Sequence, residues 1–173
     1  LFAYGPHIAT GLFEIGDSSL GKETANGLDL GLHFHTNNFE ASVSIFHTKY
    51  KDFTYLQTSG ETMDDLPEAL WLQTDATFRG WETELRWDFI ENSSGLWTLN
   101  LLADSVQAKQ ANGDNLPRIA PRRTGGDIGW RLGGWSAGLS IMHVSAQNNL
   151  APGEDRTAGY DHINANLAYT WSS

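Results

Sequence analysis

Cysteine is absent from the 173-residue sequence, which excludes a disulfide framework and a thiolate metal site. No run of about 18 apolar residues occurs, which argues against a transmembrane helix. Basic residues are few: 11 lysines and arginines stand against 21 aspartates and glutamates, and the formal net charge is −10. Because nucleic-acid binding needs a basic footprint, and the largest basic cluster is Arg122-Arg123, we expect no nucleic-acid partner.

The sequence also shows no recognisable arrangement of catalytic residues. We expect no G-x-S-x-G nucleophile elbow, and neither an HExxH pair nor a phosphate-binding glycine loop is present. The adjacent carboxylates Asp64-Asp65 in "GETMDDLPE" are typical of a solvated loop surface. We therefore expect a protein that is not an enzyme and holds no cofactor.

Apolar and polar residues instead alternate along most of the chain. In "NGLDLGLHFH" the residues Leu28 to Phe34 put leucine and phenylalanine on one face and Asp29, His33 and His35 on the other. A turn at Thr36-Asn37 with Phe34 opposite Phe39 would keep both faces in register in the next segment. In "GWETELRWDF" four ionisable side chains line a single face. A buried core could not hold them without a large desolvation cost, so this face meets water.

The segment "GWRLGGWSAGLSIMH" predicts a β-hairpin, because the Gly133-Gly134 pair suits a tight turn with positive φ. Leu132 then pairs with Trp135, and Trp130 faces Ala137. The apolar face of this hairpin carries its tryptophans beside the turn.

The same pattern over the whole chain predicts seven antiparallel strands of about ten residues. Short turns alternate with long connections at Thr58–Asp75, Ala108–Thr124 and Ser145–Tyr160. Eight aromatic residues fall near the short-turn end on the apolar face, as expected at a membrane interface: Phe34, Phe39, Trp87, Phe89, Trp97, Trp130, Trp135 and Trp171. The alternative is a soluble β-sandwich. Because a membrane sheet must close and seven strands leave two edges, we expect an all-β, antiparallel, up-and-down fragment of a larger transmembrane barrel.

Several segments resemble the C-terminal half of TonB-dependent outer-membrane receptors. They are "YGPHIATGLFEIGDSSLGKETANGLDLG" (Tyr4–Gly31), "FRGWETEL" (Phe78–Leu85), "NLPRIAPRRTGGDIGW" (Asn115–Trp130) and "TAGYDHINANLAY" (Thr157–Tyr169). "GPHIAT", "FEIG" and "LPRIAP" are most similar to a subgroup that includes zinc-uptake receptors. The resemblance covers essentially the whole chain.

The resemblance implies a 22-stranded barrel in the bacterial outer membrane, occluded by a plug domain and energised through TonB. It also implies periplasmic short turns and extracellular long loops. Lipid, lipopolysaccharide, the plug and the TonB complex are the implied partners. Residues 1–173 then form a partial barrel domain that lacks the plug, the TonB box, the first strands and the final hairpin, and we expect the chain to be an excerpt of a longer protein.

The histidines are the candidate metal ligands, since imidazole suits zinc, copper, iron and nickel. At the extracellular mouth we expect His7 and His162 near Glu14 and Asp17, on loops that converge with the acidic segments around Asp64-Asp65 and Glu154-Asp155. On the lumen face His33, His35 and Glu40 form a second candidate set, with His33 across from Glu40. The alternative for the second set is a solvated histidine pair near the short turns.

These observations favour active uptake of a scarce metal, zinc or similar, free or chelated. A ferric-siderophore receptor and a passive porin are the alternatives, because both would have the same water-filled lumen. An outer-membrane hydrolase and a soluble binding module are further alternatives.

Overall fold

The computed structural model describes residues 4–171, and within them every regular element is a β-strand. No helix in this part is long and apolar enough to cross a membrane. The strands are β1 (Tyr4–His7), β2 (Leu12–Ile15), β3 (Thr24–His35), β4 (Phe39–Met63), β5 (Leu66–Asn92), β6 (Gly95–Gln110), β7 (Arg123–Leu132), β8 (Trp135–Val144) and β9 (Tyr160–Tyr169).

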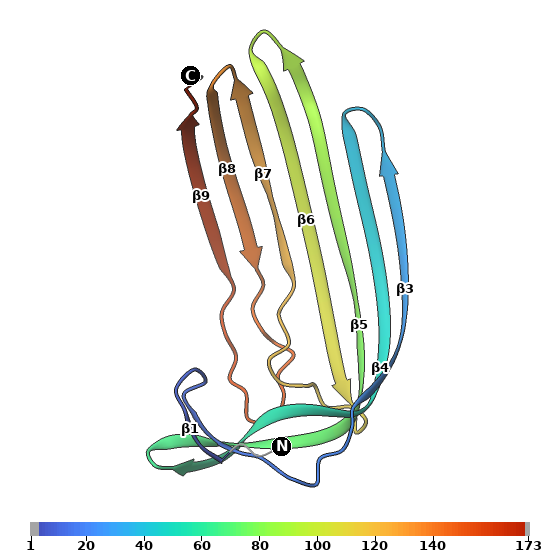
Figure 1. The fold of residues 1–173 in the computed structure, drawn as a ribbon, viewed down its shortest axis with the longest axis vertical. Helices are drawn as coiled ribbons and strands as arrows, with labels where there is room; N and C mark the ends of the chain where they lie inside the picture. Colours follow the sequence, from blue (N-terminus) through green and yellow to red (C-terminus); the bar gives the residue numbers. More distant parts are fainter. Residues whose placement is uncertain (1–3, 172–173) are drawn as a thin grey trace.

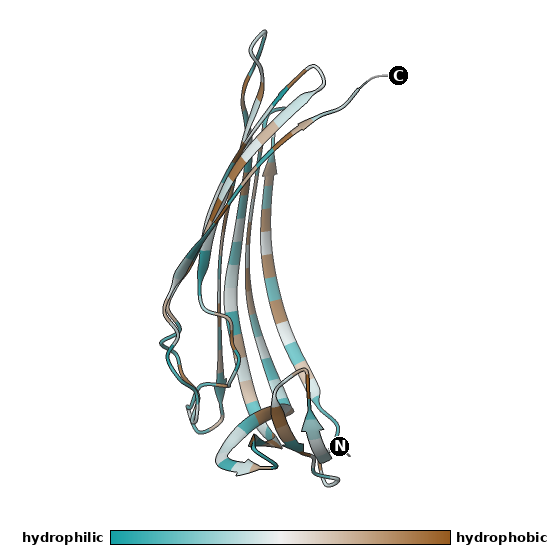
Figure 2. Ribbon diagram, turned by 90° about the vertical axis from the view of Figure 1, so that its left-hand side faces the viewer, coloured by the Kyte–Doolittle hydropathy of each residue, from teal (hydrophilic) through white to brown (hydrophobic). Residues whose placement is uncertain are grey.

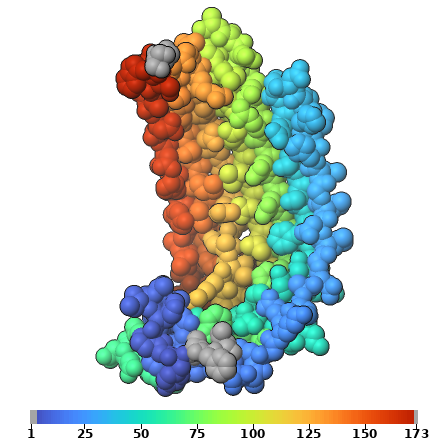
Figure 3. Space-filling view, in the orientation of Figure 1, coloured from blue at the N-terminus to red at the C-terminus, as the bar shows by residue number. Residues whose placement is uncertain are grey.

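The long strands β3 to β9 lie side by side in chain order, each antiparallel to the next, so the seven expected strands are confirmed. Two short strands were not expected: β1 pairs with β2, and β2 runs parallel to β5. Short turns occupy one end of the sheet and long loops the other (Figure 1). Strands β3 and β9 form its two edges (Figure 3).

One face of the sheet is apolar and the other is polar, as the alternation predicts. A single cross-strand row joins Phe39, Trp87, Leu99, Ile128 and Leu139, all on what we call the apolar face. Hydrophobic and hydrophilic bands alternate along the bowed strands (Figure 2). Leucines of the apolar face are uncovered, with Leu30 59% and Leu167 68% exposed. This face is therefore not packed against a second sheet, as a β-sandwich would require.

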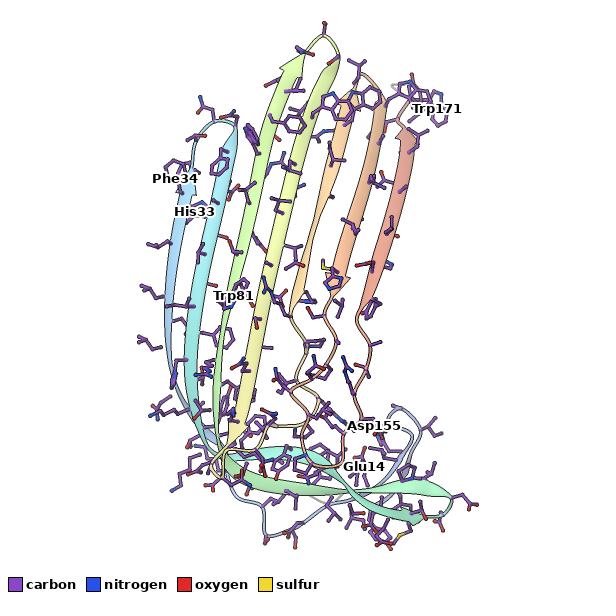
Figure 4. All side chains as sticks on the ribbon, turned by 180° about the vertical axis from the view of Figure 1, so that it is seen from behind. Glu14, His33, Phe34, Trp81, Asp155 and Trp171 are labelled. Carbon is purple, nitrogen blue, oxygen red and sulfur yellow. The ribbon has the colours of Figure 1, made fainter. Side chains whose placement is uncertain are left out.

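The aromatic residues gather near the short turns. The rings of Trp97 and Trp130 lie 6.3 Å apart, and those of Trp135 and Tyr169 lie 4.9 Å apart. Trp171 packs on Tyr169 and is seen at this end of the sheet (Figure 4). The sequence correctly placed these tryptophans on the apolar face, in a row beside the turns.

Turn chemistry explains which expected registers hold. Leu132 pairs with Trp135 around Gly133-Gly134, as expected. The Phe34–Phe39 pairing is wrong by two residues, because Phe34 pairs with Ala41 and His35 with Glu40. The Thr36 hydroxyl accepts the backbone N–H of Phe39 and the Thr36 N–H bonds to the Phe39 carbonyl, which moves the turn to Asn37-Asn38. A two-residue shift leaves both faces unchanged.

The expected long loop Thr58–Asp75 is instead the tip of a β-hairpin. Asp64 and Asp65 both have positive φ (51° and 61°), as the centre of a type I′ turn requires, so β4 and β5 continue to Met63 and from Leu66. The ladder shifts register between Tyr50 and Phe53, and there the hairpin bends across the long-loop end (Figure 1). This hairpin forms part of the surface at that end.

The other two expected loops are present but shorter. Strand β6 extends to Gln110, so the loop to β7 covers residues 111–122, and residues 145–159 connect β8 to β9. Buried Ala76, Ala108 and Leu116 form a small core under these loops. The rings of Tyr50, Phe53 and Phe78 pack on this core, and their centroids lie 5.0 to 5.1 Å from one another.

Candidate functional site

Glu14 is the buried carboxylate of the long-loop end, only 6% exposed. Strand β2 carries it beside Ala69 of β5. Oε1 accepts a hydrogen bond from the Thr10 hydroxyl at 2.8 Å, and Oε2 accepts one from Trp71 Nε1 at 3.1 Å. Both oxygens therefore have donors, which offsets the cost of burying the charge.

His7 stands next to this carboxylate. It ends β1, and its Nδ1 lies 3.7 Å from Glu14 Oε1. The Thr10 and Gly11 N–H groups bond to the His7 carbonyl and fix the turn between β1 and β2. The imidazole remains exposed to solvent. The structure thus brings together two of the four side chains expected at the mouth.

Asp17 and His162 have other neighbours. The Ser19 backbone N–H donates to Asp17 Oδ1 at 2.7 Å, and this hydrogen bond lowers the pKa of the carboxyl below its ordinary value. His162 lies on the polar face of β9, opposite Met142, with its Nδ1 3.4 Å from Asn164 Nδ2. Within residues 4–171, no three His, Asp or Glu side chains are arranged to hold a metal ion.

The second candidate set lies at the short-turn end of the polar face. His33 and His35 have ring centroids 5.8 Å apart, and His33 Nε2 is 3.5 Å from Glu40 Oε1. The contact is diagonal, since His33 pairs with Ser42 rather than with Glu40. These side chains, with Arg86 and Asp88, line an open groove of about 400 Å³.

Most of the other expected mouth carboxylates have structural roles. Asp64 and Asp65 form the hairpin turn. Glu154 joins two loops, because Oε1 accepts the Arg118 N–H at 2.6 Å and Oε2 accepts the Ala151 N–H at 3.0 Å. Asp155 is exposed at the same end (Figure 4). No pattern in the sequence indicates the loop contact of Glu154, because Arg118 and Glu154 are 36 residues apart.

The polar face is rich in negative charge. Its register places eight carboxylates against three arginines, Arg86, Arg123 and Arg131; the carboxylates are Asp29, Glu40, Glu82, Glu84, Asp88, Glu91, Asp104 and Asp127. Two arginines form ion pairs, Arg86 with Asp88 and Arg123 with Asp104, both at 2.9 Å. Carboxylates remain in excess on this part of the wall, which favours cations near it.

One pentapeptide matches a hydrolase pattern that sequence reasoning passed over. Gly134–Gly138 reads GWSAG, which fits the G-x-S-x-G nucleophile elbow. That elbow requires a sharp turn from strand to helix, whereas Ser136 lies inside the regular ladder of β8, between Arg131 and Ala168. The structural context of a nucleophile is therefore missing.

Comparisons with known proteins agree with this geometry. The family model "TonB dependent receptor-like, beta-barrel" matches residues 1–173. The copper transporter OprC has a similar structure, with a TM-score of 0.80 and 23% identity over 90% of this chain and 24% of that chain. The ferric yersiniabactin uptake receptor FyuA from Yersinia pestis gives 0.65, with 17% identity over 85% of this chain and 22% of that one. The siderophore receptor PirA from Pseudomonas aeruginosa gives 0.59, with 17% identity over 96% and 27%.

The chain thus spans about a quarter of the length of these structures. At identities of 17% to 23% these similarities show a shared fold alone, while the family model covers every residue. The all-β architecture, the uncovered apolar face and the aromatic row fit that match. The chain belongs to the TonB-dependent receptor β-barrel family and is a bacterial outer-membrane protein.

Proposed function

We propose that the complete protein takes up a scarce metal ion, zinc or a similar metal, or a metal chelate, with energy delivered through TonB. Residues 1–173 would supply consecutive strands of a 22-stranded barrel that is occluded by a plug domain. The two strand edges support this, because unpaired backbone groups facing lipid each cost several kcal/mol. Short turns would face the periplasm and long loops the outside.

The observation that carries the proposal is the excess of carboxylates on the polar face. A polar face with eight carboxylates and three arginines attracts cations by electrostatic focusing. A siderophore already saturates its metal, so it needs no such field and is held by aromatic and basic contacts. The charge therefore favours an ion over a chelate.

Histidines would contact the metal at two depths. At the mouth, exposed His7 beside Glu14 offers an imidazole with a carboxylate neighbour. His162, near the start of β9, and Asp17 would add further ligands there. Deeper, His33, His35 and Glu40 would form a transit site in the groove. Imidazole accommodates zinc and copper alike, and a similar structure is a copper transporter, so copper is the main competing ion.

Replacing His7 tests the mouth contact. We expect His7→Ala in the full receptor to lower uptake of free Zn²⁺ at limiting concentration, with expression and membrane insertion unchanged. The matched control is His47→Ala, since His47 lies on the apolar face. Normal zinc uptake by His7→Ala would refute a role for His7.

The ferric-siderophore alternative is supported by the named ligands of two similar structures. An uptake experiment distinguishes the siderophore alternative from the metal-ion proposal. Cells that express the full receptor are supplied with free zinc and a ferric siderophore in parallel. Accumulation of the ferric chelate without accumulation of zinc would replace the metal-ion proposal with the siderophore one.

A further inference from the structure

Arg86 places a positive charge inside a groove that is otherwise suited to a cation. The groove of about 400 Å³ is lined by His33, His35 and Glu40, but also by Arg86 and Asp88. We call it the transit groove. His33 marks its position on β3 near the short turns (Figure 4). A guanidinium beside a cation site repels the ion, so the position of Arg86 needs a physical explanation.

The ladder brings Arg86 closer to Glu40 than to the carboxylate that it binds. Arg86 and Glu40 are direct partners in the β4–β5 ladder, which puts their Cβ atoms about 5 Å apart. Asp88 lies two residues further along β5, a step of about 7 Å. Nevertheless Arg86 Nη2 donates to Asp88 Oδ1 at 2.9 Å and to Oδ2 at 3.3 Å. Within residues 4–171, no hydrogen bond or ion pair joins Arg86 to Glu40.

Both carboxylates have a second neighbour that holds them apart from each other. The Thr98 hydroxyl donates to Asp88 Oδ1 at 2.6 Å and fixes Asp88 beside Arg86. Glu40 points toward β3, with its Oε1 3.5 Å from His33 Nε2. The structure therefore shows an arrangement in which Arg86 is held by Asp88 and the Glu40 carboxylate is free to contact a cation.

Arg86 can exchange one carboxylate for the other at little cost. Glu40 and Asp88 lie on the same face of the sheet, so side-chain rotation is sufficient. The Arg86 side chain is 44% exposed, and ion pairs with this much contact with water contribute little to stability. A guanidinium bound to Glu40 would engage both carboxylate oxygens through its planar fork, which would leave neither oxygen for a metal ion.

We propose that Arg86 controls the occupancy of the transit groove by competing with the metal ion for Glu40. While Asp88 holds Arg86, the ion has Glu40, His33 and His35 as ligands. When Arg86 moves to Glu40, it replaces the ion on that carboxylate and releases it. The inference rests on the proposed uptake of a metal ion and adds the residue that empties the groove.

The test measures Zn²⁺ binding to the purified full receptor in nonionic detergent by isothermal titration calorimetry. His33→Ala/His35→Ala identifies the groove site, because the binding that this variant loses belongs to the groove. Arg86→Gln removes the competing cation. Asp88→Asn weakens the hold on Arg86 and tests the same exchange independently if Arg86→Gln does not fold.

Two further variants separate competition for Glu40 from simple charge repulsion. Arg131→Gln is the matched control, because Arg131 also lies on the polar face near the short turns but pairs with Leu96 and Ser136 in its ladders. Glu40→Gln, alone and combined with Arg86→Gln, completes a double-mutant cycle for the pair.

We expect Arg86→Gln to bind Zn²⁺ in the groove about tenfold more tightly than the wild type, and Asp88→Asn about tenfold more weakly. Arg131→Gln should bind as the wild type does. In the Glu40→Gln receptor, adding Arg86→Gln should give no gain in affinity, because the carboxylate for which Arg86 competes is absent.

An equal gain from Arg86→Gln with and without Glu40→Gln would overturn the inference, because Arg86 would then act only by repelling the ion. Unchanged zinc affinity in Arg86→Gln, or an equal gain in Arg131→Gln, would also overturn it while leaving the transit site in place. Zinc binding that is unchanged in His33→Ala/His35→Ala would instead refute the transit site itself, and the role of Arg86 with it.

Discussion

Glu14 illustrates how single residues hold the long-loop end in place. Its carboxylate is buried, and its donors come from Thr10, four residues away, and Trp71, 57 residues away. The Trp71 contact fastens the β1–β2 segment to β5. The sequence suggests Glu14 as a metal ligand. In the structure its carboxylate instead connects β2 to β5 through hydrogen bonds.

Removing the indole donor should loosen this tie. We expect Trp71→Phe to weaken the attachment of β1–β2 by about 1.5–3 kcal/mol, since a hydrogen bond to a charged group is lost. Hydrogen exchange of β2 amides in the full receptor measures the effect. Trp87→Phe is the control, because Trp87 lies on the apolar face. Unchanged exchange in Trp71→Phe would show that the bond does not hold β2.

Gly80 is a second position where one residue decides local packing. A Cβ there would lie 2.5 Å from both Phe46 Cζ and the Ser105 carbonyl oxygen. We expect Gly80→Ala to destabilise the receptor by about 1–3 kcal/mol through overpacking. Gly31→Ala is the control, since a Cβ at Gly31 meets no atom within 4 Å. Unfolding in denaturant should separate the two variants, and equal midpoints would contradict the steric argument.

At the scale of strands, alternation predicts faces better than it predicts registers or connections. Gly133-Gly134 fixed its hairpin because glycine tolerates the required φ, whereas Thr36 shifted the neighbouring turn through its own hydroxyl. At Asp64-Asp65 a tight turn replaces the expected loop, because aspartate can also adopt positive φ.

The sequence could not show the bend near Asp52, because it depends on side-chain contacts between segments distant in the chain. The Glu14–Trp71 contact and the position of His7 both depend on this bend. They could therefore not be predicted from the sequence either. For the candidate site, residue types were therefore predictable and their neighbours were not. His33, His35 and Glu40 are the exception, because adjacent strands with a short turn bring them together.

Assignment of the two faces can be tested with single charges. We expect Leu30→Arg and Leu139→Arg in the full receptor to cost about 2–4 kcal/mol near the bilayer midplane, because each places a charge in lipid. Ser42→Arg should be mild, since Ser42 lines a groove on the polar face. Folding into lipid vesicles with denaturant titration measures all three. Similar losses at the three positions would mean that the faces are assigned wrongly.

At the scale of the whole molecule, the sheet separates three environments. Its apolar face is uncovered, its opposite face is acidic, and the bent hairpin with the loops 111–122 and 145–159 covers the long-loop end. The loops are tied to each other by Glu154 and by the Asn115 amide, which donates to the Leu150 carbonyl at 3.1 Å. A cation entering at that end would pass fixed loops and then the acidic wall.

Zinc uptake by cells that carry the full receptor, with and without TonB, tests the central claim most directly. Radiolabelled Zn²⁺ is supplied at limiting concentration, and accumulation is compared with that of cells lacking the receptor. We expect uptake to require both the receptor and TonB, because a plugged barrel with an acidic interior needs energy to release its ion. Receptor-dependent uptake that persists at the same rate without TonB would identify a passive porin, and no receptor-dependent zinc uptake at all would contradict the metal-ion account.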